Sequence, residues 1–131
     1  MTKRIKRRSD CPISFALDIF GDKWSLLIIR DLMFKEKRTY SEFLISEEKI
    51  STNILADRLA KLEDAGLISK FRCLYSLTEK GIDLVPVMVE IIRWSANHDK
   101  KTGAPKEFVD RIKHDRENFI AELTMCLSTG R

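Results

Sequence analysis

Residues 39–77 read TYSEFLISEEKISTNILADRLAKLEDAGLISKFRCLYSL, and they are the most informative part of the chain. Thr39 and Glu42 have the spacing of a capping box, in which each side chain accepts a hydrogen bond from the other residue's backbone N–H. A short helix is therefore predicted to begin there. Ser51 is a good N-cap for a second helix. Residues 47–49 are left for a tight polar turn between the two helices.

The predicted second helix has two different sides. Leucines share one side at helical spacing, while polar or small residues share the other. The leucines are Leu55, Leu59 and Leu62, and the opposite side carries Asn53, Asp57, Ala60 and Asp64, with Ala56 on the flank. We therefore expect one side to pack in a core and the other to be free to meet a groove.

A hairpin is predicted directly after this helix. Gly66 is suited to end the helix in the left-handed conformation, and two short apolar runs follow at residues 67–71 and 74–77. Helix, turn, helix and hairpin in this order indicate a winged helix-turn-helix. The same residues also fit two amphipathic helices and a hairpin in any small α+β domain, because capping boxes and leucine stripes are common structural devices.

Further motifs lie within this unit and before and after it. They are Cys11-Pro12, Leu17-Asp18, Gly21-x-Lys23-Trp24-x-Leu26-Leu27-Ile28-Ile29-Arg30, Ile50-Ser51, Leu55-x-x-Arg58-Leu59-x-x-Leu62-Glu63-x-x-Gly66-Leu67 and Tyr75-x-Leu77-Thr78-x-x-Gly81. In order and separation, these motifs resemble the HxlR family of bacterial transcription regulators, from Cys11 to Trp94. The resemblance implies a dimeric winged-helix protein that binds double-stranded operator DNA. It also implies a recognition helix at residues 51–65, a wing at residues 67–77, and dimerisation through the flanking helices.

The predicted wing is shorter than in many members of that family, which carry a longer wing that contains proline. Here only Arg72 and Cys73 separate the two strand patterns. Deep contacts with the minor groove therefore do not follow from the resemblance. Lys70 and Arg72 can still reach phosphates from a short hairpin.

The rest of the chain is predicted to be mostly helical. Helices are expected over residues 12–20, over residues 23–34 with Asp22 as N-cap, from Thr78 to the neighbourhood of His98, and over residues 106–127. Pro86 lacks an N–H, so it should bend the third of these helices or split it in two. The expected fold class is mainly α with a small β-hairpin wing. The expected organisation is a basic arm (1–10), a winged helix-turn-helix domain (11–98), and a linker with a C-terminal helix (99–131).

Apolar residues beyond Pro86 cover most of the circumference of the predicted helix. They are Val87, Met88, Val89, Ile91, Ile92 and Trp94. Because a surface helix of a monomer shows one apolar stripe, part of this surface is expected to be covered by a symmetric partner chain. The C-terminal helix is expected to join that homodimer interface, and packing on its own subunit is the alternative.

Basic residues are concentrated at the start of the chain, which has 131 residues and a net charge of +4. They are Lys3, Arg4, Lys6, Arg7 and Arg8. Such an arm can neutralise phosphates beside the recognition helix, with binding that weakens as salt rises, or it can be a solvated tail. Neither a secretory signal nor a membrane span is recognised, so a cytoplasmic protein is expected.

The start of the second helix is predicted to read bases in the major groove. Asn53 is the first candidate, because its side chain can form two hydrogen bonds with an adenine edge. The predicted base-reading residues are Ser51, Thr52, Asn53, Ala56 and Asp57. Asp57 fits only where it accepts from cytosine or pairs with a nearby cation. The predicted phosphate-binding residues are Arg38, Lys49, Arg58, Lys61, Lys70 and Arg72, although each can also be an ordinary solvated side chain.

The three cysteines form no CxxC pair, and the two histidines have no partner at metal-ligand spacing, so neither a metal site nor a cofactor is expected. Cys11 differs from the others because it precedes a helix N-terminus and follows Arg7 and Arg8, which favour the thiolate. It also matches the cysteine that is modified in HxlR members that sense quinones, aldehydes or oxidants. Cys11 is therefore a candidate sensor, and a buried, inert thiol is the alternative.

Two other functions are alternatives to DNA binding. A thiol-dependent enzyme at Cys11 lacks a matched histidine or carboxylate nearby in sequence, and no glycine-rich phosphate loop is present, so an enzyme is not expected. The remaining alternative is a winged-helix module for protein contacts without specific DNA binding. The predicted outward direction of Asp57 and Asp64 would suit such a module.

Overall fold

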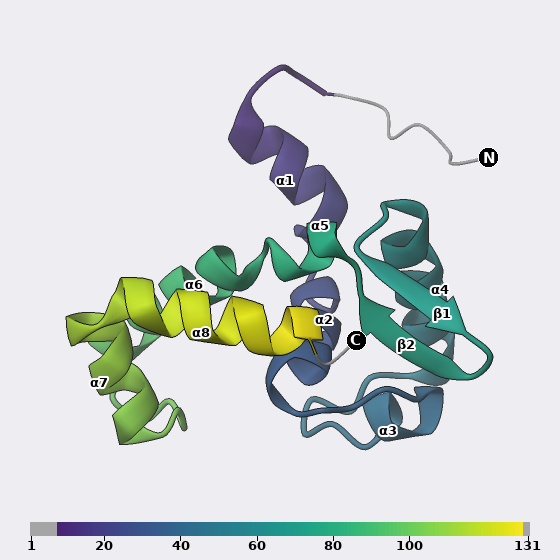
Figure 1. Ribbon diagram of the computed structural model, residues 1–131. Coiled ribbons are helices and arrows are strands. Elements are labelled where there is room, and N and C mark those ends of the chain that lie inside the picture. Colours follow the sequence, from purple (N-terminus) through teal and green to yellow (C-terminus); the bar gives the residue numbers. More distant parts are fainter. Residues whose placement is uncertain (1–7, 130–131) are drawn as a thin grey trace. The chain divides into compact units, whose positions relative to one another are not determined.

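The computed structural model describes residues 8–129 (Figure 1). The protein is mainly helical with one two-stranded antiparallel hairpin, which confirms the predicted fold class. The chain divides into two compact units between Gly81 and Ile82. Among residues 8–129, none of the helices has the length and apolar character that a membrane span requires.

The first unit contains the helix-turn-helix and the hairpin. Its elements are α1 (Pro12–Phe20), α2 (Ser25–Phe34), α3 (Tyr40–Leu44), α4 (Thr52–Asp64), β1 (Ile68–Phe71) and β2 (Leu74–Leu77), followed by α5 (Glu79–Ile82) at the boundary. α1 has the predicted bounds. α2 begins two residues later than predicted, and its N-cap residue is Trp24 and not Asp22 as predicted. The Asp22 carboxylate accepts hydrogen bonds from the backbone N–H groups of Trp24 (2.9 Å) and Ser25 (3.0 Å) and holds the preceding residues in a turn.

The end of α4 directs the chain into the hairpin. Gly66 has a φ of 79°, in the left-handed region. Its N–H donates to the carbonyl of Glu63 (2.9 Å), and the N–H of Leu67 donates to the carbonyl of Leu62 (3.0 Å), which together form a Schellman motif. The chain reverses at this point, and β1 packs against α4.

The two faces of the hairpin differ in character. Ile68 pairs with Leu77, and Phe71 pairs with Leu74. Because side chains alternate across a strand, Ile68 and Leu77 lie on the buried face with Tyr75, whereas Phe71 and Leu74 are exposed on the other. The buried core of this unit includes Ile28, Ile29, Phe43, Leu55, Leu59 and Leu62.

The second unit consists of three helices that pack on one another, α6 (Val85–His98), α7 (Lys106–His114) and α8 (Arg116–Thr129). The helix predicted to begin at Thr78 is split in two, as Pro86 indicated. α5 ends at Ile82, and Pro86 lies in the first turn of α6, where its missing N–H costs no helical hydrogen bond.

The prediction of a single helix over residues 106–127 is wrong. The helix breaks at Asp115, which has a φ of −143° and a ψ of 38°. The break lets Phe108 and Phe119 pack edge to face, with their ring centroids 4.7 Å apart. Arg111 spans the break through hydrogen bonds to Asp115 (2.9 Å) and Glu122 (2.6 Å). Packing between the two helical segments therefore overrides the continuous helical period of the sequence.

Candidate nucleic-acid interface

Both predicted caps are formed, at the start of α3 and at the start of α4. Thr39 Oγ1 accepts from the Glu42 N–H (3.2 Å), and the Glu42 carboxylate accepts from the Thr39 N–H (3.0 Å), which confirms the capping box. Ser51 Oγ accepts from a backbone N–H in the first turn of α4 (3.3 Å). Lys49 has a φ of 57°, so one left-handed residue reverses the chain between the helices.

α4 presents one face to the core and another to solvent. Its three leucines are buried. The predicted base-reading residues are all exposed on its N-terminal half, and they are Ser51, Thr52, Asn53, Ala56 and Asp57. A helix exposed in this way can enter the major groove with its N-terminal residues at the base edges.

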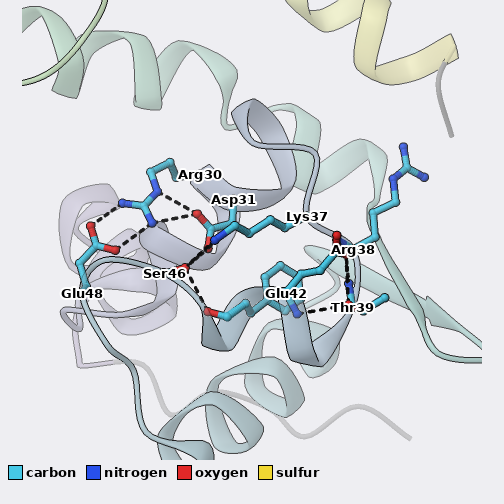
Figure 2. Close-up of polar contacts among 9 residues, drawn as sticks. Arg30, Asp31, Lys37, Arg38, Thr39, Glu42, Ser46 and Glu48 are labelled. Atoms are coloured by element: carbon cyan, nitrogen blue, oxygen red, sulfur yellow. Dashed lines mark hydrogen bonds and ion pairs between the residues drawn. The ribbon is translucent and has the colours of Figure 1, made fainter.

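A buried carboxylate anchors the turn to α2 (Figure 2). Asp31 is 2% exposed, and it accepts hydrogen bonds from Arg30 Nε (3.0 Å), Arg30 Nη2 (2.8 Å) and Ser46 Oγ (2.7 Å). Lys37 Nζ donates to Ser46 Oγ (3.1 Å) and lies 3.9 Å from Asp31 Oδ2. Arg30, Asp31, Lys37, Ser46 and Glu48 are called the turn anchor below.

Within the turn anchor, Arg30 connects Asp31 to Glu48. Nη1 and Nη2 of Arg30 donate to the two carboxylate oxygens of Glu48 at 2.6 and 2.9 Å, which makes a bidentate pair. Hydrogen bonding to Arg30 lowers the pKa of Glu48 to about 2. Hydrogen bonding to Glu48 in turn raises the pKa of Arg30. Both groups are therefore charged and paired at neutral pH.

Arg58 lies between two carboxylates. Its Nε donates to Asp22 Oδ2 (2.8 Å), and its Nη1 donates to Asp57. Lys61 Nζ lies 3.2 Å from Asp57 Oδ2, and its hydrogen bond lowers the pKa of Asp57. Asp57 thus pairs with two cations, which is one of the two arrangements under which a base-reading role was predicted for it. A phosphate contact by Arg58 would have to compete with Asp22 and Asp57.

Two predicted phosphate-binding residues lie near α3. Lys49 is exposed in the α3–α4 turn. Arg38 is exposed just before α3, where its backbone N–H donates to Glu42 (2.9 Å) and its carbonyl accepts from the Tyr75 N–H (2.8 Å). Figure 2 shows the Arg38 side chain pointing away from Asp31.

The hairpin follows α4 directly. β1 begins where α4 ends and packs against it (Figure 1). Lys70 Nζ lies 5.4 Å from the ring centroid of Tyr75, and Arg72 Cζ lies 5.4 Å from that of Phe71.

The cysteines Cys11, Cys73 and Cys126 are free and exposed. Cys11 is the N-cap residue of α1, and its exposure contradicts the expectation of burial that belonged to the alternative of an inert thiol. Arg8, one of the two arginines expected to favour the thiolate, pairs with Asp18, because its Nε donates to Asp18 Oδ1 (2.7 Å). The other basic residues of the predicted arm, Lys3, Arg4, Lys6 and Arg7, lie outside the described residues. Between residues 8 and 129, no group of acidic, histidine and cysteine side chains is placed to hold a metal ion.

The turn anchor was not predicted from the sequence. Its pairs join Asp31 to Ser46 and Arg30 to Glu48, which are 15 and 18 positions apart, so no helical or strand period reveals them. The available signal is that Arg30 and Asp31 interrupt the apolar run of α2. A charge on such a helix needs a partner when it is buried.

Comparison with known sequences identifies similar proteins. The family model described as HxlR-like helix-turn-helix matches residues 19–102. An uncharacterised HTH-type transcriptional regulator of Synechocystis sp. is 36% identical over 86 residues, which make up 60% of this chain and 63% of that protein. The chain therefore spans slightly less than two thirds of the length of this relative.

Comparison with solved structures identifies similar folds. PA1607, a candidate transcription factor, is 35% identical with a TM-score of 0.63, over 76% of this chain and 71% of that one. Quinone-bound YodB from B. subtilis is 32% identical with a TM-score of 0.59, over 66% of this chain and 99% of that one. The reduced form of the transcriptional regulator YodB is 28% identical with a TM-score of 0.59, over 72% and 100% of the two chains.

Proposed function

The chain belongs to the HxlR-like helix-turn-helix family of transcription regulators, and we propose that it is a cytoplasmic homodimer that binds operator DNA sequence-specifically. Proteins of this family are regulators and not enzymes. The observation that carries the proposal is the exposed N-terminal half of α4, next to a turn that is tied to the core by the turn anchor.

In this proposal α4 lies in the major groove and Asn53 reads an adenine edge. Ser51, Thr52 and Ala56 meet neighbouring bases or thymine methyl groups, and Asp57 borders them. The phosphates are bound by Arg38, Lys49, Arg58, Lys61, Lys70 and Arg72. The alternative of a protein-contact module rests on Asp57 and Asp64. The Asp57 carboxylate is paired with Arg58 and Lys61, which leaves the exposed Asp64 as its support.

Exposed apolar side chains on two helices support the homodimer. Ile13 and Leu17 of α1 are 71% and 50% exposed, and they are one helical turn apart. Ile91 and Trp94 of α6 are 43% and 61% exposed. A second copy of the chain would remove these surfaces from water, and a twofold dimer would place two copies of α4 on an inverted repeat.

Control of DNA binding through Cys11 is a further part of the proposal. The thiol is exposed, and it lies at the N-terminus of α1. YodB has been solved with a bound quinone and in a reduced form. We expect a quinone to weaken operator binding by the wild type but not by Cys11→Ser, with Cys73→Ser and Cys126→Ser as controls. Equal effects on wild type and Cys11→Ser would contradict this part.

Sequence-specific binding is tested by comparing two duplexes. The operator is first identified by sequencing the genomic fragments that the purified protein retains, and a scrambled duplex of the same composition is the control. Operator affinity is expected to exceed scrambled affinity by about a thousandfold or more at physiological salt. Both affinities should fall as salt rises. Equal affinity for the two duplexes would contradict the proposal.

A further inference from the structure

We propose that Glu48, held by Arg30, is a positioning residue that sets how α4 lies on the operator and so controls base discrimination without touching a base. The inference rests on the proposed DNA binding by α4. It assigns a role in recognition to an ion pair whose two members come from α2 and from the α3–α4 turn.

The first step is that Arg30 has little freedom to turn. Its Nε and Nη2 face the Asp31 carboxylate, whose side chain is 3% exposed and also accepts from Ser46. These bonds fix the plane of the guanidinium. The remaining N–H groups of Nη1 and Nη2 then define where the Glu48 carboxylate must lie relative to α2.

The second step is that the path from Glu48 to α4 is short. Only Lys49 and Ile50 separate Glu48 from the N-cap residue Ser51. Lys49 is in the left-handed conformation, and Ile50 is buried at 8% exposure, so neither residue can easily change its conformation to absorb a movement of Glu48. A displacement of Glu48 would therefore pass to the first turn of α4, which carries Asn53.

The third step is that the α3–α4 turn is bonded to α2 on both sides of Glu47. Ser46 is bonded to Asp31, and Glu48 is bonded to Arg30. Glu47, between them, is exposed, and none of the ion pairs among residues 8–129 includes it. Glu47 and Glu48 therefore carry the same charge on the same turn, but only Glu48 is attached to the core.

Because only Glu48 is attached to the core, variants of Glu47 and Glu48 can distinguish positioning of α4 from electrostatic repulsion of phosphate. If carboxylates in the turn acted only by repelling phosphate, removing either glutamate would strengthen binding to every DNA sequence. If Glu48 acts by positioning α4, Glu48→Ala should lower the preference for the operator, and Glu47→Ala should not. Glu47→Ala is thus the matched control.

The experiment measures dissociation constants of full-length variants for the operator and the scrambled duplex at one salt concentration. Glu48→Ala is expected to lower the operator-to-scrambled affinity ratio about tenfold, since one good base contact contributes about 1 to 3 kcal/mol and tenfold corresponds to about 1.4 kcal/mol. Glu47→Ala is expected to leave the ratio unchanged. Glu48→Gln, which keeps an acceptor for Arg30, should give an intermediate value, and it serves if Glu48→Ala does not fold.

A second arm combines each change with Asn53→Ala. If Glu48 acts by placing Asn53, then Glu48→Ala should reduce the ratio less than about twofold in the Asn53→Ala background, because the contact is already lost. An effect of Glu48 that does not act through Asn53 would give the same loss of the ratio in both backgrounds. Provided that the wild type prefers its operator, any of three outcomes would overturn the inference. They are the same loss in both backgrounds, an equal loss for Glu47→Ala, and an unchanged ratio for Glu48→Ala. A wild type without any preference would overturn the proposed function and the inference together.

Discussion

Asp22 shows how one carboxylate can serve two elements. It lies before the N-cap residue Trp24 and, as an N-cap side chain would, accepts from the N–H groups of Trp24 (2.9 Å) and Ser25 (3.0 Å) at the start of α2. It also accepts from Arg58 of α4 (2.8 Å). Burial opposes its ionisation, but hydrogen bonds from Ser25, Trp24 and Arg58 outweigh burial and lower its pKa to about 2. The ionised carboxylate therefore stabilises the start of α2 and the position of Arg58.

Asp22→Ala should destabilise the protein at neutral pH by about 1 kcal/mol, the usual contribution of an N-cap. Because the folded-state pKa is lowered, the contribution of Asp22 is present above the ordinary aspartate pKa and is lost as the pH falls towards 2. Urea unfolding of wild type and variant should show a constant difference above about pH 5 that narrows at lower pH. A difference that does not change between pH 5 and pH 2 would contradict this assignment.

Single-residue features were predictable where they are local. The caps at Thr39 and Ser51 follow from side chains within three positions of their partners, and the structure confirms both. Arg58 is one of the predicted phosphate-binding residues. Its guanidinium is instead paired with Asp22, 36 positions earlier, and no sequence period connects such distant residues.

Arg72, at the tip of the hairpin, combines a strained backbone conformation with a positive charge. Arg72 has a φ of 58°, a region that costs a residue with a side chain about 1 kcal/mol relative to glycine. It is followed by Cys73 in a two-residue connection between β1 and β2. The position thus keeps an arginine where glycine would be the easier residue for the backbone.

Arg72→Gly should have opposite effects on stability and on DNA binding. Relief of the strained φ should raise the free energy of unfolding by about 0.5 kcal/mol after the added freedom of the unfolded chain is counted. Loss of the charge should weaken operator and scrambled DNA alike and reduce the salt slope by about one. Lys70→Ala is the control, with weaker binding and no gain in stability. A loss of both stability and operator preference in Arg72→Gly would contradict this view of the tip.

Elements were predictable where one chain segment carries its own signals. Proline and glycine mark the ends of α1, and the leucine spacing marks α4. The break between α7 and α8 was missed, because it depends on Phe108 packing against Phe119 and not on a helix-breaking residue. Packing between segments is decided in three dimensions, and apolar periodicity alone does not report it.

At the scale of the whole molecule, the proposal is a homodimer that covers the exposed apolar residues of α6. Trp94→Asp on α6 should convert the dimer to a monomer, because a charge would be placed on the apolar surface that the partner is proposed to cover. Light scattering after size-exclusion chromatography measures the mass directly. Phe71→Asp is the matched control, since Phe71 is also exposed but lies on the hairpin. A Trp94→Asp protein that keeps the mass of the wild-type dimer would contradict this interface.

The candidate site was predictable in outline for the same reason that α4 was. Its exposed face follows from helical spacing, and all five predicted base-reading residues are exposed. The spacing could not predict which residues hold that face in place. The turn anchor pairs Arg30 and Asp31 of α2 with turn residues that are 18 and 15 positions away in the sequence. Recognition by α4 is thus proposed to depend on the exposed residues and on a buried carboxylate behind them.

Base reading by Asn53 is tested most directly by changing each base pair of the operator in turn and measuring the affinity of the wild type and of Asn53→Ala. Asn53→Ala should lose about 1 to 3 kcal/mol on the intact operator and should no longer discriminate at one or two base positions. Arg58→Ala should instead weaken binding to all of these duplexes alike. An equal loss for Asn53→Ala on every duplex, with discrimination unchanged at all positions, would contradict base reading by α4.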